Sequence, residues 1–341
     1  MKQLSVVMTN YNTQPDYLKS AVESVLNQTF SDFEFIVVDD GSTDSSPNII
    51  EEYAKSDSRI IFFKNESNMG ITKSLNRGFS AAGGEYIARM DADDISLSTR
   101  FEKQIDFMNR HPDVIVCGTW ADLIGEGAEK RKKKTWTVEL PEREEFRCSL
   151  LFGNQASIIH PTAIFRKSML DRFDIKYDEN YPVSQDYKMW VECSKYAQCS
   201  NVPEILFQYR LNNKAVSATA SSKQYLMTKK NIKEQLSRLH IDISDDDYNI
   251  HYGFLTGRKA YDKNTYRWLR KLIDSNDRYE YFNKKVFGDI IWSKWAEIIY
   301  YDFALNRSPR KLVDHLFDLP NKYKVRLLKK IIYKGLKKNA V

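Results

Sequence analysis

Three carboxylates stand within four residues of each other, directly after an apolar run. The run from Ile87 to Met90 is typical of the end of a buried strand, and Asp91, Asp93 and Asp94 follow it at once. Carboxylates spaced two apart on a tight turn can face one divalent ion such as Mg²⁺ or Mn²⁺. Such an ion prefers oxygen ligands and keeps positions open for the phosphate oxygens of a substrate.

The same stretch allows a second interpretation, in which one of these side chains caps a helix. Asp94 or Ser96 could accept hydrogen bonds at the start of a helix running from about Leu97 to Asn109. Both interpretations can hold together. A cap explains one acid but not three beside an apolar strand, so the sequence favours a site for a metal ion or a polar ligand.

Strand and helix patterns alternate through the first part of the chain. This alternation with short connections predicts an α/β fold, with a mainly parallel sheet covered by helices on both faces. Ligands of such sheets bind beyond the carboxyl ends of the strands, where Asp39 and Asp40 join the acidic turn at 91–94. The expected strands are 4–9, 33–38, 60–63 and one ending at 90, and the expected helices are 15–26, 46–54 and 70–82.

After the acidic turn the pattern is less regular. We expect strands at 114–118, 162–166 and 205–210 and helices at 142–152 and 186–196, whereas helical spacing dominates beyond about residue 217. The predicted organisation is therefore an α/β domain at 1–216 followed by a smaller α-helical region at 217–341.

Composition indicates an ordinary globular protein, with 42% hydrophobic and 29% charged residues. Four cysteines show neither paired nor metal-ligand spacing, and Met1 and Lys2 lead into strand-like sequence without a secretory segment. No apolar run is long enough to span a bilayer. We therefore expect a cytoplasmic protein.

The positive charge of the chain is local. The formal net charge is +6, and basic residues gather at 130–134 and at 322–338, where eight basic residues occur without an acid. The run at 130–134 fits a solvated loop or a contact with an anionic partner. The segment 322–338 fits a terminal helix with its lysines in water. It also fits a helix lying on an anionic membrane surface, which would make the protein peripheral on the inner face of the cell membrane.

Several motifs in order resemble the inverting nucleotide-sugar glycosyltransferases of family 2, which have the Rossmann-like GT-A fold. The resemblance covers about the first 215 residues and implies a nucleotide-sugar half at about 1–110 and an acceptor half at about 111–216. The matching segments are Met8 to Asn12, Val37 to Asp44, Asn68 to Gly70 with Asn76, Asp91 to Asp94, His160 to Thr162, Gln185 to Tyr187 with Trp190, and Tyr209 with Arg210.

The resemblance implies a donor site for a UDP-sugar with Mn²⁺ or Mg²⁺. Asp40, with Asp39 beside it, would accept from the uracil N3–H, and Asp93 would bind the ion that bridges the two phosphates. Asp91 would reach the ribose or metal-bound water and is a second candidate metal ligand. The remaining predicted donor-site residues are Thr9, Asn10 and Tyr11 around the base and ribose, Ala92 in the acidic turn, and Lys73 and Arg210 near the phosphates. Arg210 could instead pair only with a surface acid.

Asp186 is the catalytic base that the resemblance implies. With an ordinary pKa of about 3.9 it would be ionised at neutral pH and could take the proton of the acceptor hydroxyl during attack. Asp186 could alternatively act only as a helix N-cap. The family usually has Glu before this Asp, whereas this chain has Gln185, which leaves the role of that neighbour open. His160 could line the acceptor side or be structural.

These residues together predict a metal-dependent hexosyl- or N-acetylhexosaminyltransferase that moves one sugar from a UDP-sugar to a saccharide acceptor. The QxxRW segment and membrane spans of processive family members are missing, so single transfer is expected. The basic C-terminus makes a lipid-linked acceptor an option, as in the synthesis of capsule, exopolysaccharide or lipopolysaccharide.

Two other functions are possible on the residues alone. A sugar nucleotidyltransferase also uses an α/β sheet with acidic metal sites, but Thr9 to Thr13 lack the glycine-rich loop of such enzymes and of dinucleotide-binding dehydrogenases. A non-catalytic basic protein that binds membrane or nucleic acid would leave the acidic clusters without a purpose, so no nucleic acid is expected. The sequence indicates neither the sugar nor the oligomeric state.

Overall fold

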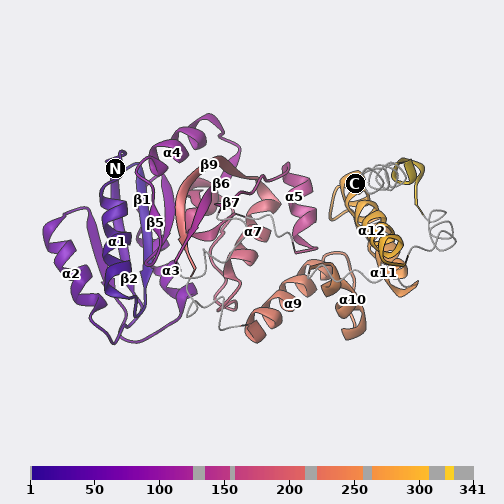
Figure 1. Ribbon diagram of the computed structural model, residues 1–341, viewed down its shortest axis with the longest axis horizontal. Coiled ribbons are helices and arrows are strands. Elements are labelled where there is room, and N and C mark those ends of the chain that lie inside the picture. Colours follow the sequence, from indigo (N-terminus) through magenta and orange to yellow (C-terminus); the bar gives the residue numbers. More distant parts are fainter. Residues whose placement is uncertain are drawn as a thin grey trace, which may run out of the picture. The chain divides into compact units, whose positions relative to one another are not determined.

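The chain forms two compact units in the computed structural model, which describes residues 2–125, 135–153, 158–211, 221–255, 263–306 and 319–325. The first unit comprises Met1–Arg143 with Ala156–Thr228, and the second comprises Glu144–Gln155 with Lys229–Val341 (Figure 1). The second unit thus includes residues 144–155 as well as the C-terminal helices. The basic run at 130–134 lies outside the described residues, as does the segment 322–338 from residue 326 onward.

A single sheet of nine strands organises the described part of the first unit (Figure 1). Its order is β3-β2-β1-β4-β8-β6-β9-β5, with β7 paired to β6. The first four strands in sequence are mutually parallel, as expected for alternating strands and helices, and β6 is parallel to β9. The strands are β1 Leu4–Asn10, β2 Phe33–Asp39, β3 Ile60–Lys64, β4 Tyr86–Asp91, β5 Ile95–Ser96, β6 Val114–Ile124, β7 Thr135–Trp136, β8 Ile164–Arg166 and β9 Gln198–Arg210.

Helices cover both faces of this sheet because the buried strands are apolar on both sides. On one face, alternate residues of β1 and β2 join a core with α1 Pro15–Leu26, α2 Ser46–Ser56 and α4 Arg100–Arg110. On the other face, α3 Ile71–Ala81 lies close to β1, where Gly78 faces Val7. Trp190 of α7 Gln185–Tyr196 stacks on Phe165 of β8, with ring centroids 5.9 Å apart.

Tertiary pairing changed several of the predicted boundaries. Strand β9 begins at Gln198, seven residues before the predicted start, because it follows β6 along its whole length. The two-residue strand β5 pairs with the end of β9 and delays α4 until Arg100. A 3-10 turn at His160–Thr162 replaces the predicted start of β8, and helix α6 Lys167–Arg172 was not predicted. These differences come from pairing between distant segments, which local periodicity does not report.

The second unit is helical. Its buried His251 donates from Nε2 to the carbonyl oxygen of Leu151 at 2.7 Å and accepts at Nδ1 from the indole N–H of Trp268 at 3.1 Å. Burial lowers the pKa of His251 to about 4, so the ring is neutral and can both donate and accept. The helices are α5 Arg143–Leu150, α9 Ser221–Ser237, which starts in the first unit, α10 Asp245–Leu255, α11 Lys263–Tyr279 and α12 Lys284–Asn306. None of the described helices combines the length and apolar character that crossing a membrane requires.

Replacing Gly84 by Ala should destabilise the first unit, whereas Gly83→Ala should have little effect. A Cβ at Gly84 would lie 2.7 Å from the backbone nitrogen of Ser5 in β1, whereas one at Gly83 would meet only the Glu34 side chain at 3.4 Å. Overpacking against backbone costs about 1–3 kcal/mol. Urea unfolding followed by circular dichroism measures both variants, and equal stability of the two would contradict the packing seen here.

Candidate active site

The register of the sheet brings the predicted donor residues to one edge. Asn10 pairs with Asp39 across β1 and β2, and Thr9 pairs with Asp91 across β1 and β4. All of these residues lie at the carboxyl ends of parallel strands, where α/β sheets bind their ligands.

The three acids of the turn after β4 form a tight cluster. Carboxylate oxygens of Asp91, Asp93 and Asp94 all lie within 4.8 Å of one another. Asp94 is 1% exposed, and its Oδ1 accepts from the backbone N–H of Arg210 at 2.7 Å. Its Oδ2 has no hydrogen-bond donor among the described residues. Helix α4 begins at Arg100 without a side-chain cap, so the interpretation of Asp94 or Ser96 as its cap is wrong.

A buried arginine lies beneath this cluster. Arg89 of β4 is 2% exposed and forms a two-pronged ion pair with Asp91, with N–O distances of 2.5 and 2.7 Å. Arg89 is not among the site residues predicted from the sequence. Arg89 could have been found because it is a charged residue inside an otherwise apolar strand. A buried charge needs an oppositely charged partner, which the acids after the strand provide. Both carboxylate oxygens of Asp91 are therefore engaged by the protein itself.

Burial and the neighbouring carboxylates make ionisation of Asp93 and Asp94 unfavourable. The pKa of Asp93 is raised to about 6, mainly by desolvation and then by the charge of Asp91. The pKa of Asp94 is raised well above its ordinary value by desolvation and by both neighbours. The charge of Arg89 offsets part of this cost in both residues. Clustered oxygens, the unpaired Oδ2 of Asp94 and raised pKa values are what a divalent cation would stabilise, so the residues present fit a Mg²⁺ or Mn²⁺ ion.

Asp39 ties the ends of β1 and β2 together. It is fully buried and accepts from Asn10 Nδ2 at 2.6 Å and from the backbone N–H of Ser42 at 3.0 Å. The Ser42 hydroxyl donates to the same carboxylate at 2.5 Å. The hydrogen bonds of Asp39 and Asn10 thus hold the loop after β2 in place.

Asp40 holds the segment that leads into α3. Its Oδ1 accepts from Asn65 Nδ2, the backbone N–H of Met69 and the Ser74 hydroxyl, and its Oδ2 accepts from the backbone N–H of Gly70. The side chain is 3% exposed, and its two oxygens are shared among four donors. Because Oδ2 accepts from a single donor, it keeps the capacity to accept from the uracil N3–H, but the side chain is buried, and the uracil role stays a prediction.

The other predicted donor residues surround this edge at different depths. Tyr11 is 49% exposed just after β1, Lys73 is exposed on the first turn of α3, and Ala92 is buried. Arg210 donates from Nε to the carbonyl oxygen of Asp93 at 2.7 Å, and its guanidinium lies 4.1 Å from the centre of the Tyr17 ring. Arg210 therefore fixes the acidic turn through its backbone rather than pairing with a surface acid.

Asp186 lies in the first turn of α7, one residue after Gln185, which is buried. Ser184, with a left-handed φ of 57°, precedes the helix, and Oδ1 of Asp186 accepts from the backbone N–H of Tyr187 at 2.8 Å. Desolvation raises the pKa of Asp186, with a further increase from Asp91, so the expectation of an ordinary pKa was wrong. The charge of Arg89 acts in the opposite direction, which shows that Asp186 shares the electrostatic environment of the acidic cluster.

His160 is buried rather than open to an acceptor. Its Nε2 lies 2.8 Å from the Tyr177 hydroxyl, and its ring packs edge-on against Trp190. Burial, helped by the positive charge of Arg89, lowers its pKa well below the usual value, so the ring stays neutral. Tyr177 is a site neighbour that sequence reasoning missed, and its phenol pKa is raised by burial.

This arrangement of a mainly parallel α/β sheet with an acidic edge is that of a GT-A glycosyltransferase. Residues 5–173 match the family described as glycosyl transferase family 2. An uncharacterized glycosyltransferase of Methanocaldococcus jannaschii is 36% identical over 226 residues, which cover 65% of this chain and 76% of that protein. The chain belongs to glycosyl transferase family 2 and is a glycosyltransferase, which removes the nucleotidyltransferase and non-catalytic alternatives.

Two further similarities concern pathway and fold. The O-antigen biosynthesis glycosyltransferase WbnJ of Escherichia coli is 30% identical over 225 residues, covering 64% of this chain and 84% of that protein. The structure of S. aureus TarS 1–349 in complex with UDP-GlcNAc superposes with a TM-score of 0.57 and 18% identity, covering 98% of this chain and 92% of that one. At this identity the second likeness shows the fold alone.

Replacing Asp93 by Asn should stabilise the protein at pH 7.5 in the presence of a chelator and have little effect at about pH 3.5, below the pKa of the unfolded chain. The folded state holds the Asp93 proton more tightly than the unfolded chain, so stability falls as the pH rises from about 4 to about 6. Asn cannot ionise and avoids this loss, which is worth roughly 1–3 kcal/mol. Thermal unfolding at both pH values measures the difference, with Asp171→Asn on α6 as the exposed control. An equal loss of stability at both pH values would argue against a strained Asp93 carboxylate.

Proposed function

We propose that the chain is a metal-dependent, inverting glycosyltransferase that moves one sugar from a UDP-sugar to a saccharide acceptor in the synthesis of a cell-surface polysaccharide. The observation that carries this proposal is the acidic cluster at the carboxyl edge of the sheet, with the unpaired Oδ2 of Asp94. Two similar proteins support it, since WbnJ acts in O-antigen biosynthesis and TarS was crystallised with UDP-GlcNAc.

The donor half of the proposed site has separate tasks for its acids. Asp93 and Asp94 would hold Mn²⁺ or Mg²⁺, and enzymes of this family generally use a divalent metal ion. Asp91 is held by Arg89 and is therefore better placed to accept from the ribose or from metal-bound water than to bind the ion directly. When bound, the ion supplies positive charge that stabilises the departing diphosphate. Arg210 keeps the acidic turn in place through the Asp93 carbonyl.

Asp186 would act as the general base. Its raised pKa, caused mainly by desolvation, makes it a stronger base than an exposed aspartate. It would take the proton of the acceptor hydroxyl as that oxygen attacks the anomeric carbon, and the bond to UDP would break on the opposite side. One such displacement inverts the anomeric configuration. Neutral His160 would support Tyr177 behind the site instead of exchanging protons.

The acceptor and the location of the protein depend on other parts of the chain. A lipid-linked acceptor and attachment to an anionic membrane surface are proposed from the basic segment 322–338, of which the structure describes residues 322–325. Gln185, next to the base in the first turn of α7, is our prediction for the acceptor side, and its buried side chain would have to turn outward to reach the acceptor.

Calorimetry should detect UDP binding with Mn²⁺ and a large loss of affinity when a chelator is added or when Asp93 is replaced by Ala. The reason is that two phosphates cannot approach three carboxylates without an intervening cation. GDP and dTDP should bind more weakly than UDP. The exposed carboxylate of Asp171 on α6 provides the control variant Asp171→Ala. Equal affinity of UDP with and without the ion would refute the metal site.

Asp186→Asn should lower kcat by about 10²–10⁴ while leaving UDP binding unchanged. Asn keeps an oxygen that can accept from the Tyr187 N–H, so the start of α7 should remain intact. Initial rates with a UDP-sugar and saccharide acceptors measure the effect, and the exposed Asp174→Asn is the matched control. A variant with full activity would exclude Asp186 as the base.

A further inference from the structure

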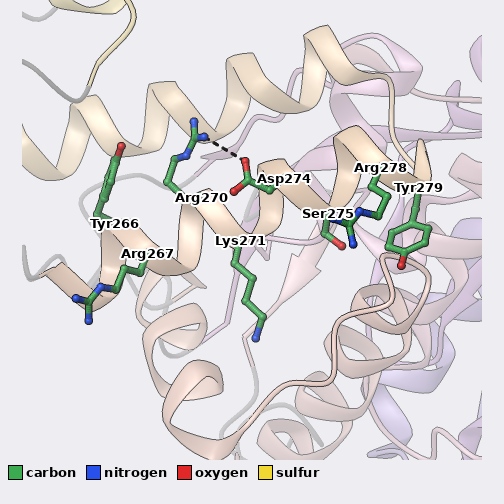
Figure 2. A pocket seen from close by; sticks show the side chains of 8 residues that line it. All are labelled: Tyr266, Arg267, Arg270, Lys271, Asp274, Ser275, Arg278 and Tyr279. Carbon is green, nitrogen blue, oxygen red and sulfur yellow. Dashed lines mark hydrogen bonds and ion pairs between the residues drawn. The ribbon is translucent and has the colours of Figure 1, made fainter.

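A basic groove runs along α11 in the second unit. Its volume is ≈ 470 Å³, and four of the eight lining side chains are cations, against one carboxylate. Figure 2 shows the charged side chains spread along the helix, with Tyr266 near one end and Tyr279 at the other. The lining residues are Tyr266, Arg267, Arg270, Lys271, Asp274, Ser275, Arg278 and Tyr279.

Helix geometry separates this groove from the core of the second unit. Arg267, Lys271 and Arg278 recur at spacings of four and seven residues, which places them on one exposed face. The opposite face carries Leu269 and Asn276, which are almost fully buried. From Arg267 to Arg278 the helix rises by roughly 16 Å, because each residue adds about 1.5 Å. The cations therefore form a row long enough for an extended ligand.

Only part of this positive charge is neutralised by the protein. Arg270 pairs with Asp274 at 3.1 Å, and Lys271 lies 3.3 Å from Asp247 of α10. Within the described part of the chain, no carboxylate pairs with the guanidinium groups of Arg267 or Arg278. By contrast, the exposed Arg110 of α4 is paired with Asp106 one turn away. Unpaired guanidinium forks match the oxygens of phosphate groups.

Aromatic rings accompany these cations. Tyr279 is 43% exposed and is held flat by stacking on His240, with ring centroids 3.9 Å apart. Tyr266 packs against Trp295 with centroids 5.3 Å apart. Immobilised tyrosines offer an apolar face and a hydroxyl, which suit the C–H face and the hydroxyls of a sugar ring. Guanidinium groups that can bind phosphate thus lie between two tyrosine rings that can contact a sugar. This combination fits a ligand that carries both phosphate and sugar.

We infer that the α11 groove binds the phosphate group of a phosphorylated saccharide acceptor, an inference that rests on the proposed glycosyltransferase function. A flat bilayer would not enter a groove, and no aliphatic side chain lines it to insert among lipids. A saccharide phosphate is narrow enough to lie along the helix, and its phosphate group can meet either arginine, with Lys271 between them. The groove thus assigns an anionic acceptor to the enzyme and gives the second unit a role in holding it.

The test uses the full chain with Mn²⁺ and excess UDP, so that the donor site is occupied. The probe is the methyl ester of N-acetylglucosamine 1-diphosphate, which has no nucleoside, and methyl N-acetylglucosaminide is its neutral counterpart. Calorimetry should show binding of the charged probe that weakens as salt is added, and much weaker binding of the neutral sugar. The triple variant Arg267→Glu, Lys271→Glu and Arg278→Glu should raise the Kd of the charged probe by about tenfold or more.

A control variant distinguishes the loss of the groove cations from the change in the net charge of the protein. Lys55→Glu, Arg110→Glu and Arg172→Glu change the charge equally at exposed sites of the first unit and should leave the Kd within about twofold. If the charge-reversed groove impairs folding, Arg267→Gln with Arg278→Gln provides the milder test. Absence of probe binding to the native chain, or equal binding by the groove and control variants, would overturn the inference. Binding to phosphatidylglycerol vesicles in place of the probe would also overturn it.

The test of the groove can be distinguished from a test of the donor site. Binding of UDP with Mn²⁺ should be the same in the groove variant and the native chain, because the groove lies in the second unit. Loss of UDP binding in the native chain would contradict the proposed function, whereas loss of probe binding alone would contradict only the groove.

Discussion

The ion pair between Arg89 and Asp91 is the interaction on which the site depends. Three carboxylates within 4.8 Å repel one another, and burial removes much of the water that would screen them. Arg89 places a permanent positive charge under the cluster and engages both oxygens of Asp91. Desolvation is the main cause of the shifted pKa values of Asp93, Asp94, Asp186 and His160, and the charge of Arg89 acts on all four, so one buried side chain links both proposed halves of the site.

The neighbouring strand ends use carboxylates for a different purpose. Asp39 and Asp40 are as buried as Asp94, but every oxygen of theirs accepts hydrogen bonds from loop backbone or short polar side chains. Satisfied carboxylates of this kind fix loop geometry, whereas incompletely satisfied ones attract a cation. One edge of the sheet thus has carboxylates that fix loop geometry after β2 and carboxylates suited to a cation after β4.

The two units offer complementary chemistry. The first carries clustered acids, which would repel a phosphate in the absence of a cation, and the second carries arginines, whose guanidinium groups are suited to phosphate oxygens. For an enzyme with an anionic donor and an anionic acceptor, such a division would keep the two ligands at separate sites. The family relationship accounts for the first unit, whereas the α11 groove is a feature of this chain that the family match at 5–173 does not reach.

Local sequence was sufficient for the alternating elements, the acidic turn, the GT-A class and the family, because apolar periodicity and short motifs are properties of neighbouring residues. It did not determine which acids are satisfied. Asp40 looked available for a nucleobase, yet it accepts from Asn65, Met69, Gly70 and Ser74, up to 34 residues away. The long start of β9, the pairing of Arg89 and the raised pKa of Asp186 likewise arise between distant segments. Tertiary structure decided these features because desolvation and hydrogen-bond partners depend on what packs around a side chain, which its own stretch of sequence does not contain.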